Sequence, residues 1–217
     1  MVKKKIIVIG CPGSGKSTFC RRLHELTGIP LYHLDMLYFN ADRTIVEREV
    51  FMERLNGVLE RDSWIIDGNY LRTMQLRMGK CDAVFFLDYP ADVCEQGILA
   101  RRGKPRSDMP WTEMPQETDE ELLQRVRNFQ TESRPRIMEL LSVRPEEMLV
   151  VDDLKPGYDM ARSVGVPFAA AGWAYDVKEI RTFLQENCPL YFDTPDALYR
   201  YLFEPGVDEA EPAFRIS

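Results

Sequence analysis

The sequence predicts an α/β fold in which helices cover both faces of a parallel β-sheet, giving three layers. Short apolar runs alternate with amphipathic stretches along the chain, and this repeat of strand, loop and helix is typical of such folds. In addition, the apolar run at 6–9 leads directly into a glycine-rich loop and then into a helix at 17–26. That order is typical of parallel sheets that bind ligands at the carboxyl ends of their strands.

The glycine-rich loop, residues 10–17, has the pattern G-x-x-x-x-G-K-S. Glycine lets the backbone turn so that several N–H groups point at a polyphosphate, and the following helix adds its partial positive charge. We expect Lys16 to reach the β- and γ-phosphates and the Ser17 hydroxyl to ligate Mg²⁺. The sequence therefore predicts ATP and Mg²⁺ as cofactors. The predicted nucleotide-binding residues are Gly10, Gly13, Ser14, Gly15, Lys16, Ser17 and Thr18.

Composition limits the partners of the chain. Its 217 residues, 45% of them hydrophobic, suffice for one large domain or for one domain with an appendage. Nucleic acid is not expected as a partner at a formal net charge of −7, because general nucleic-acid binders usually carry a basic face. The five cysteines form no C-x-x-C pair and fit reduced thiols of a cytoplasmic protein. No apolar run approaches the ~20 residues of a membrane helix, so no membrane contact is expected.

The remaining elements of the first half follow from apolar periodicity and from turn residues. Gly28 and Pro30 end the first helix. The run between Asp82 and Asp88 is apolar throughout, so we expect this strand to be central in the sheet. Pro135 is expected to break the last helix. We expect strands at 6–9, 31–35, 63–69 and 82–88, and helices at 17–26, 45–61, 70–78, 91–102 and 118–141.

Residues 103–117 differ from the rest of the first half, because they hold three prolines and charges of both signs. A segment of this length without regular structure is usually a functional lid or disordered, and we predict a lid here. Trp111 within it could cover a base or pack against its own domain.

From about residue 145 the pattern changes to a βαβαβα segment. We expect strands at 148–153, 167–172 and 190–192, and helices at 157–164, 177–186 and 195–202. The first of these strands could also complete the sheet of the first half as a fifth strand. The sequence thus predicts a domain at 1–142, a second at 143–204 and a flexible tail at 205–217.

Several motifs of the first half together resemble a known family. They are the phosphate loop, "YHLD" ending at Asp35, "WIIDGNY" at 64–70, "R-T-x-x-L-R" at 72–77 and "FFLDYP" at 85–90. This set resembles the adenylate-kinase-related proteins labelled DNA topology modulation proteins and, more widely, the nucleoside monophosphate kinases. The resemblance covers about residues 3–142 and implies a five-stranded P-loop kinase core with an arginine-bearing lid.

The resemblance also implies roles for single residues. Asp67 matches an acidic residue that helps to hold Mg²⁺ through water, and Arg72 matches an arginine that contacts the acceptor phosphate. Gly97 stands where these kinases place an arginine that contacts the donor nucleotide, which motivates the alternative of a catalytically weak nucleotide-binding regulatory protein. The remaining matches are Arg101 and Arg102 at the base of the lid and Arg125 in the helix after it.

The identity of the acceptor decides what else the chemistry needs. Phosphoryl transfer depends mainly on positioning and charge neutralisation, so a phosphate acceptor needs no general base. A hydroxyl acceptor needs a carboxylate, and Asp35 is the candidate, with a helix cap or an ion pair as its structural alternative. Asp67 could instead stabilise a turn, and for Asp88 and His33 we favour a structural role. Arg125 is preferred to Arg127 for the site.

The second half carries a further resemblance. The stretch "LVVDDLKPGYDMARSVGVPFAAAGWAYD" within 145–203 resembles the C-terminal half of haloacid dehalogenase-type hydrolases. It implies Mg²⁺ binding by Asp152 and Asp153, with Asp159 further on. The D-x-D nucleophile motif of those hydrolases is absent from the chain, so we expect a structural or regulatory appendage.

The leading hypothesis is a cytoplasmic ATP-dependent kinase that phosphorylates a small molecule, nucleotide- or nucleoside-like. The alternatives are the regulatory protein and a simple NTPase or DNA-associated factor. The sequence leaves the oligomeric state open, a homo-oligomer included.

Overall fold

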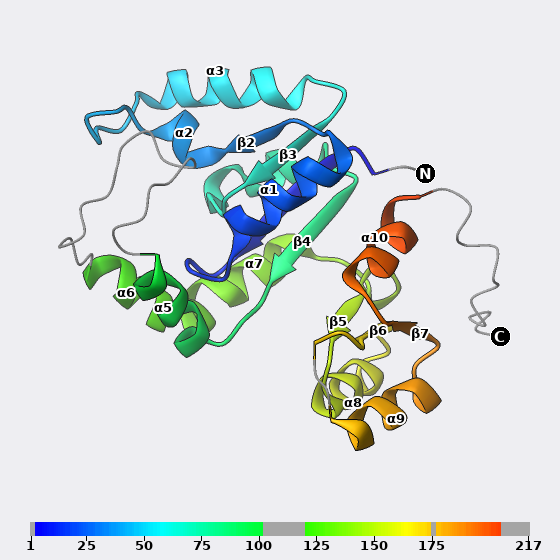
Figure 1. Cartoon of the computed structure of the whole chain (residues 1–217). Helices are drawn as coiled ribbons and strands as arrows, with labels where there is room; N and C mark the ends of the chain where they lie inside the picture. The colour runs from blue at the N-terminus through cyan, green and yellow to red at the C-terminus, as the bar shows by residue number, and fades with distance from the viewer. Residues whose placement is uncertain (1–2, 102–119, 175–176, 205–217) are drawn as a thin grey trace. The chain divides into compact units, whose positions relative to one another are not determined.

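The computed structural model describes residues 3–101, 120–174 and 177–204. The chain divides into two compact units, one of Lys3–Leu141 and one that begins at Ser142 (Figure 1). The predicted lid at 103–117 and the predicted tail at 205–217 lie outside the described residues.

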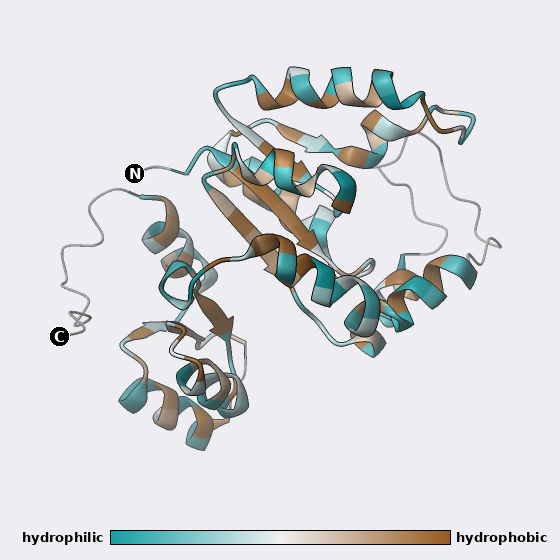
Figure 2. Cartoon of the chain, turned by 180° about the vertical axis from the view of Figure 1, so that it is seen from behind, coloured by the Kyte–Doolittle hydropathy of each residue, from teal (hydrophilic) through white to brown (hydrophobic). Residues whose placement is uncertain are grey.

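The first unit is built on parallel strands in the order β2-β3-β1-β4. The side chains of Ile6, Ile7, Val8 and Ile9 in β1 are fully buried, as expected for a strand between two others and under helices on both faces. Figure 2 shows the strands in the middle of this sheet as mainly hydrophobic. The predicted α/β fold with a parallel sheet is confirmed. The strands are β1 (Lys5–Gly10), β2 (Leu31–His33), β3 (Trp64–Asp67) and β4 (Ala83–Leu87).

Two expectations for this sheet are wrong. The resemblance implied five strands, and the described residues form a sheet of four. β4, expected in the centre, is the last strand in the order, and its residues are half-buried. An apolar run indicates that both faces of a strand are covered, but it does not tell how many neighbouring strands there are.

The helices of the first unit lie near their predicted positions. In Figure 1, α1 lies in front of the sheet and α7 behind it. Among the described residues, no helix is both long and apolar enough to cross a membrane. The helices are α1 (Lys16–Thr27), α2 (Leu34–Tyr38), α3 (Arg48–Leu59), the 3₁₀ turn η1 (Leu71–Thr73), α4 (Met74–Met78), α5 (Ala91–Ala100), α6 (Glu120–Arg127) and α7 (Arg134–Leu141).

The predicted helix at 118–141 is interrupted, but not at Pro135. A π-helical turn at Phe129–Ser133 separates α6 from α7, and Pro135 occupies the first turn of α7. Proline is tolerated in a first turn because the N–H that it lacks would have no partner within the helix.

The second unit has its own parallel sheet, in the order β5-β6-β7. Its core is formed by Ala161, Val166, Phe168, Ala170, Leu184 and Cys188. The expectation that the strand at 148–153 completes the first sheet is wrong, because β5 pairs with β6. The predicted βαβαβα order is confirmed. Its elements are the 3₁₀ turn η3 (Pro145–Glu147), β5 (Val150–Asp152), α8 (Lys155–Ser163), β6 (Phe168–Ala171), α9 (Lys178–Asn187), β7 (Leu190–Phe192) and α10 (Pro195–Phe203).

Candidate functional site

The glycine-rich loop packs tightly against two neighbouring elements. A Cβ atom on Gly10 would lie 2.4 Å from the carbonyl oxygen of Leu87 in β4. A Cβ atom on Gly13 would lie 2.0 Å from the carbonyl oxygen of Cys94 in α5. Both glycines and Gly15, which precedes α1, have φ values between 86° and 147° that other residues rarely adopt. The loop therefore needs glycine at these positions for its shape and its packing.

Polar groups of the loop point into its own turn. The Lys16 ammonium donates a hydrogen bond of 2.9 Å to the carbonyl oxygen of Cys11. Burial lowers the pKa of Lys16, and the charge of Asp67 opposes this effect. The Ser14 hydroxyl is buried and has no hydrogen-bond partner in the part of the chain that the structure describes. A cation and an unsatisfied hydroxyl in a glycine-rich turn are suited to bind phosphate oxygens.

Ser17 and Asp67, the two predicted metal-binding residues, lie in contact. Asp67 ends β3 and is 6% exposed, and its Oδ2 atom accepts a hydrogen bond of 2.7 Å from the Ser17 hydroxyl. A hydroxyl beside a carboxylate suits Mg²⁺, which in nucleotide sites takes few protein ligands and completes its shell with phosphate and water. No cluster of three or more His, Cys, Asp or Glu side chains fit for a metal occurs within the described ranges. The pair thus fits a metal held jointly with a nucleotide.

His33 also belongs to this cluster, although the sequence favoured a structural role. Its Nδ1 atom lies 2.8 Å from Asp67 Oδ2, and both side chains are nearly buried. The parallel pairing of β2 with β3 places His33 directly opposite Asp67. The spacing of residues along the chain does not give this register, so the sequence alone does not predict the contact.

Asp35 lies near the expected edge of the sheet but not at a strand end. β2 stops at His33, and Asp35 is in the first turn of α2. Its Oδ1 atom accepts a hydrogen bond of 2.7 Å from the Tyr70 hydroxyl. Burial and then the charge of Asp35 raise the pKa of Tyr70, so the hydroxyl remains a donor. The sequence interpretation did not single out Tyr70.

Of the predicted arginines, Arg101 lies close enough to the phosphate loop for its charge to assist burial in lowering the pKa of Lys16. Arg72 is exposed in η1, and Arg101 follows the last turn of α5. Arg125 is exposed, and its Nε atom donates a hydrogen bond of 3.3 Å to the Glu121 carbonyl oxygen of the same helix. Arg102 lies outside the described residues. The role of these arginines in transfer stays a prediction.

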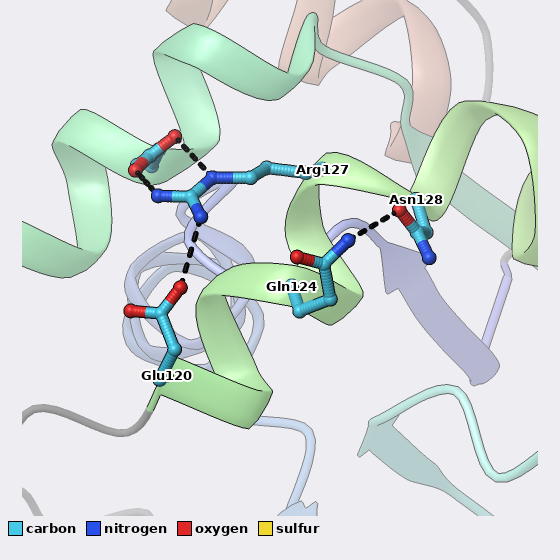
Figure 3. Close-up of polar contacts among 5 residues, drawn as sticks. Glu120, Gln124, Arg127 and Asn128 are labelled. Carbon is cyan, nitrogen blue, oxygen red and sulfur yellow. Dashed lines mark hydrogen bonds and ion pairs between the residues drawn. The ribbon is translucent and has the colours of Figure 1, made fainter.

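Arg127 links α5 to α6 through its ion pair with Glu95, and it also pairs with Glu120 within α6. Its guanidinium lies 2.6 Å from Glu95 and 3.0 Å from Glu120, and Figure 3 shows the contact with Glu120. The hydrogen bond from Arg127 lowers the pKa of Glu95. In the same view, the Gln124 amide donates to the Asn128 side chain at 2.8 Å. Arg127 therefore positions these helices, which is a structural role.

Gly97 departs from the kinase pattern for a reason of packing. A Cβ atom on this residue would lie 2.2 Å from the carbonyl oxygen of Gly13 in the phosphate loop. The α5 backbone therefore lies directly against the loop, and this backbone leaves no room for an arginine at position 97. Packing alone accounts for glycine at position 97, so this departure is no sign of weakened nucleotide binding.

The other aspartates singled out by the sequence have local partners. Asp88 accepts a hydrogen bond of 2.7 Å from Arg134, which agrees with a structural role. In the second unit, Asp152 Oδ1 accepts from the backbone N–H groups of Asp153 and Leu154, and Asp159 pairs with Lys155. Burial and the neighbouring Asp152 raise the pKa of Asp153. These contacts describe a turn and the start of α8.

Comparison with known proteins places the chain near P-loop kinases. No family model matches it. It is 28% identical over 158 residues to an adenylate kinase of Thermotoga maritima, covering 69% of this chain and 70% of that protein. It is 27% identical over 158 residues to an adenylate kinase of Thermotoga petrophila, again covering 69% of this chain and 70% of that protein. These relatives support a P-loop kinase-like function that acts on a nucleotide or small molecule.

Solved structures similar to the chain include two shikimate kinases. One, from Acinetobacter baumannii in complex with shikimate, has a TM-score of 0.45 and 19% identity, covering 74% of this chain and 90% of that one. The other, from Bacteroides thetaiotaomicron, has a TM-score of 0.41 and 17% identity, covering 85% of this chain and 96% of that one. The narrower resemblances to topology modulation proteins and to haloacid dehalogenases are not shown by these comparisons.

Proposed function

We propose that the protein transfers the γ-phosphoryl group of ATP to a small-molecule acceptor, nucleotide- or nucleoside-like. The observation that supports this most is the contact of Ser17 in the phosphate loop with Asp67 at the end of the adjacent strand. Parallel strands bind ligands at their carboxyl ends, and here a phosphate loop, a hydroxyl and a carboxylate meet at that edge. Similarity to proteins named adenylate kinase points to the same chemistry.

The residues have distinct tasks in this proposal. Lys16 leaves the Cys11 carbonyl and binds the β- and γ-phosphates, while the N–H groups of the loop hold the remaining oxygens. Ser17 and Asp67 would hold Mg²⁺, which neutralises the phosphate charge when bound. His33 orients Asp67 through their hydrogen bond. An acceptor oxygen bonds to the γ-phosphorus, the bond to the β-γ bridging oxygen breaks, and ADP departs.

Asp35 has a task only if the acceptor is a hydroxyl. It then binds the hydroxyl and takes its proton as the new P–O bond forms. The hydrogen bond from Tyr70 holds the carboxylate in place for this step. A phosphate acceptor is already ionised, and it would rely on arginines such as Arg72, Arg101, Arg102 and Arg125 instead.

An acceptor screen tests the proposal. ADP release is measured with ATP and Mg²⁺ across nucleoside monophosphates, nucleosides and small hydroxy compounds, and Lys16→Ala serves as the inactive control. We expect release that depends on one class of acceptor and is lost in the control. Binding of ATP without turnover on any acceptor would instead support the regulatory alternative.

Asp35→Asn then separates the two classes of acceptor. For a hydroxyl acceptor we expect a fall in kcat of about 10²-fold or more, because general-base catalysis contributes on that order. For a phosphate acceptor the variant keeps kcat close to that of the wild type. A large fall with a phosphate acceptor would contradict the assigned task of Asp35.

A further inference from the structure

The loop of residues 67–70 contacts three separate parts of the candidate site. Asp67 accepts from Ser17, as described above. The Asn69 side chain accepts from the Gly10 N–H at 3.0 Å and donates to the Gly10 carbonyl at 2.9 Å. The Tyr70 hydroxyl donates to Asp35. One short loop therefore joins the predicted metal-binding residues Ser17 and Asp67, the start of the phosphate loop and the carboxylate of Asp35.

Arg77 holds the backbone of this loop from inside the protein. The residue lies in α4 and its side chain is fully buried. Its guanidinium donates to the carbonyl oxygens of Gly68 at 3.0 Å and Tyr70 at 3.2 Å, and also to that of Asn69. Burial lowers the pKa of Arg77 to about 10, a sign of how strongly the site is desolvated. Three successive carbonyls thus share one buried cation.

This arrangement suits arginine and not lysine. The planar guanidinium offers five N–H donors in a fixed fork, so it can hold several carbonyls at set angles, whereas an ammonium is a compact point charge. The loop needs such support because Tyr70 has φ 35°, in the left-handed region that non-glycine residues rarely adopt. A buried charge is costly unless it is well hydrogen-bonded, and here three backbone carbonyls bond to the guanidinium, whereas an apolar side chain would leave them without these donors.

We propose that Arg77 is a positioning residue for both sides of the site, an inference that rests on the proposed function. By fixing the carbonyls of residues 68–70, it sets the Asn69 amide on Gly10 and the Tyr70 hydroxyl on Asp35. Arg77 thereby aligns the phosphate loop with the acceptor carboxylate without touching either substrate.

The test measures ADP binding to the full chain by calorimetry in the presence of Mg²⁺, so that no acceptor is needed. We expect Arg77→Lys and Asn69→Ala each to weaken ADP binding by at least tenfold, because both release the phosphate loop from Asn69. The control is Val58→Ala in α3, a buried core substitution that lowers the melting temperature but leaves ADP affinity within twofold of the wild type. Wild-type affinity in Arg77→Lys would overturn the proposal.

The double variant shows whether Arg77 acts through Asn69. We expect Arg77→Lys to add less than twofold in the Asn69→Ala background, and a further tenfold loss would contradict this route. If Arg77→Lys does not fold, Asn69→Ala alone decides. Wild-type affinity of Asn69→Ala for ADP would then refute the inference. A wild-type protein that binds ADP but phosphorylates no acceptor would refute the proposed function and leave this test intact.

Discussion

At the scale of single residues, the site depends on short hydrogen bonds between side chains that lie far apart in the sequence. Ser17, His33 and Asp67 form one such group, and Asp35 with Tyr70 forms another. Each residue lies at or just after the carboxyl end of a strand in one parallel sheet or at the start of α1. The fold therefore assembles the polar groups, and their hydrogen bonds orient them before any ligand arrives.

The Tyr70–Asp35 pair predicts a pH dependence of stability. The pKa of Tyr70 is raised in the folded protein above its usual value of 10, so the folded state keeps a proton that the unfolded state loses above pH 10. The stability of the wild type relative to Tyr70→Phe should be constant below about pH 10 and then fall, by up to about 1.4 kcal/mol per pH unit.

Urea unfolding from pH 7 to 11 measures this difference. Tyr89→Phe is the control, because it removes the hydroxyl of a tyrosine that is 49% exposed. A difference between the wild type and Tyr70→Phe that stays constant up to pH 11 would rule out the buried, carboxylate-bound hydroxyl.

Several residues of the site could be predicted from the sequence because one local pattern defines them. The glycines, Lys16 and Ser17 follow from the phosphate-loop motif alone. His33 and Tyr70 could not, because their contacts depend on the register of β2 against β3 and on a left-handed turn. Arg77 ends the R-T-x-x-L-R motif, but the sequence does not show that its side chain points inward to backbone carbonyls.

At the scale of elements, the packing of α5 against the phosphate loop explains why glycine occurs at positions 13 and 97. Backbone meets backbone where Gly97 of α5 lies against Gly13 of the loop. Glycines at both positions permit this approach, and any side chain would push the helix and loop apart. The residue that departs most clearly from the kinase pattern thus has a structural cause.

Gly97→Ala should therefore destabilise the protein and weaken ADP binding. The added Cβ would lie 2.2 Å from the Gly13 carbonyl oxygen, and relieving such overlap typically costs about 1–3 kcal/mol. Gly57→Ala is the matched control, because Gly57 lies within α3 and a Cβ there would meet nothing within 4 Å.

Urea unfolding and ADP calorimetry on both variants check this prediction. We expect Gly57→Ala to gain about 0.5–1 kcal/mol from helix propensity and to bind ADP normally. Equal behaviour of the two alanine variants would show that α5 does not press on the loop.

The elements also show where pattern reasoning stops. The apolar run of β4 predicts a strand, but it does not predict that this strand lies at the end of the order. The same limit applies to β5, because its apolar run predicts a strand but does not tell which of the two sheets it joins. Periodicity reports which faces are covered, whereas strand order depends on contacts between distant segments.

At the scale of the whole molecule, each unit has its own parallel sheet and its own hydrophobic core. The candidate site uses described residues of the first unit alone. We therefore expect ADP with Mg²⁺ to raise the temperature of the unfolding transition of that unit and not of the second. At 100 times its dissociation constant, a ligand stabilises the state that it binds by about 2.7 kcal/mol.

Differential scanning calorimetry with and without ADP measures the effect. Lys16→Ala should remove the shift, because the phosphates lose their main cation. An equal rise for all unfolding events in the wild type would mean that the two units unfold as one.

The central claim is that the phosphate loop passes a phosphoryl group to a small organic molecule. The most direct measurement follows the label of γ-³²P-ATP in a mixture of nucleosides, nucleoside monophosphates and small hydroxy compounds. We predict that the label appears in a new organic phosphate, that Lys16→Ala abolishes this transfer, and that Asp67→Asn weakens it. Label that remains in ATP, or that appears only as inorganic phosphate, would contradict the claim.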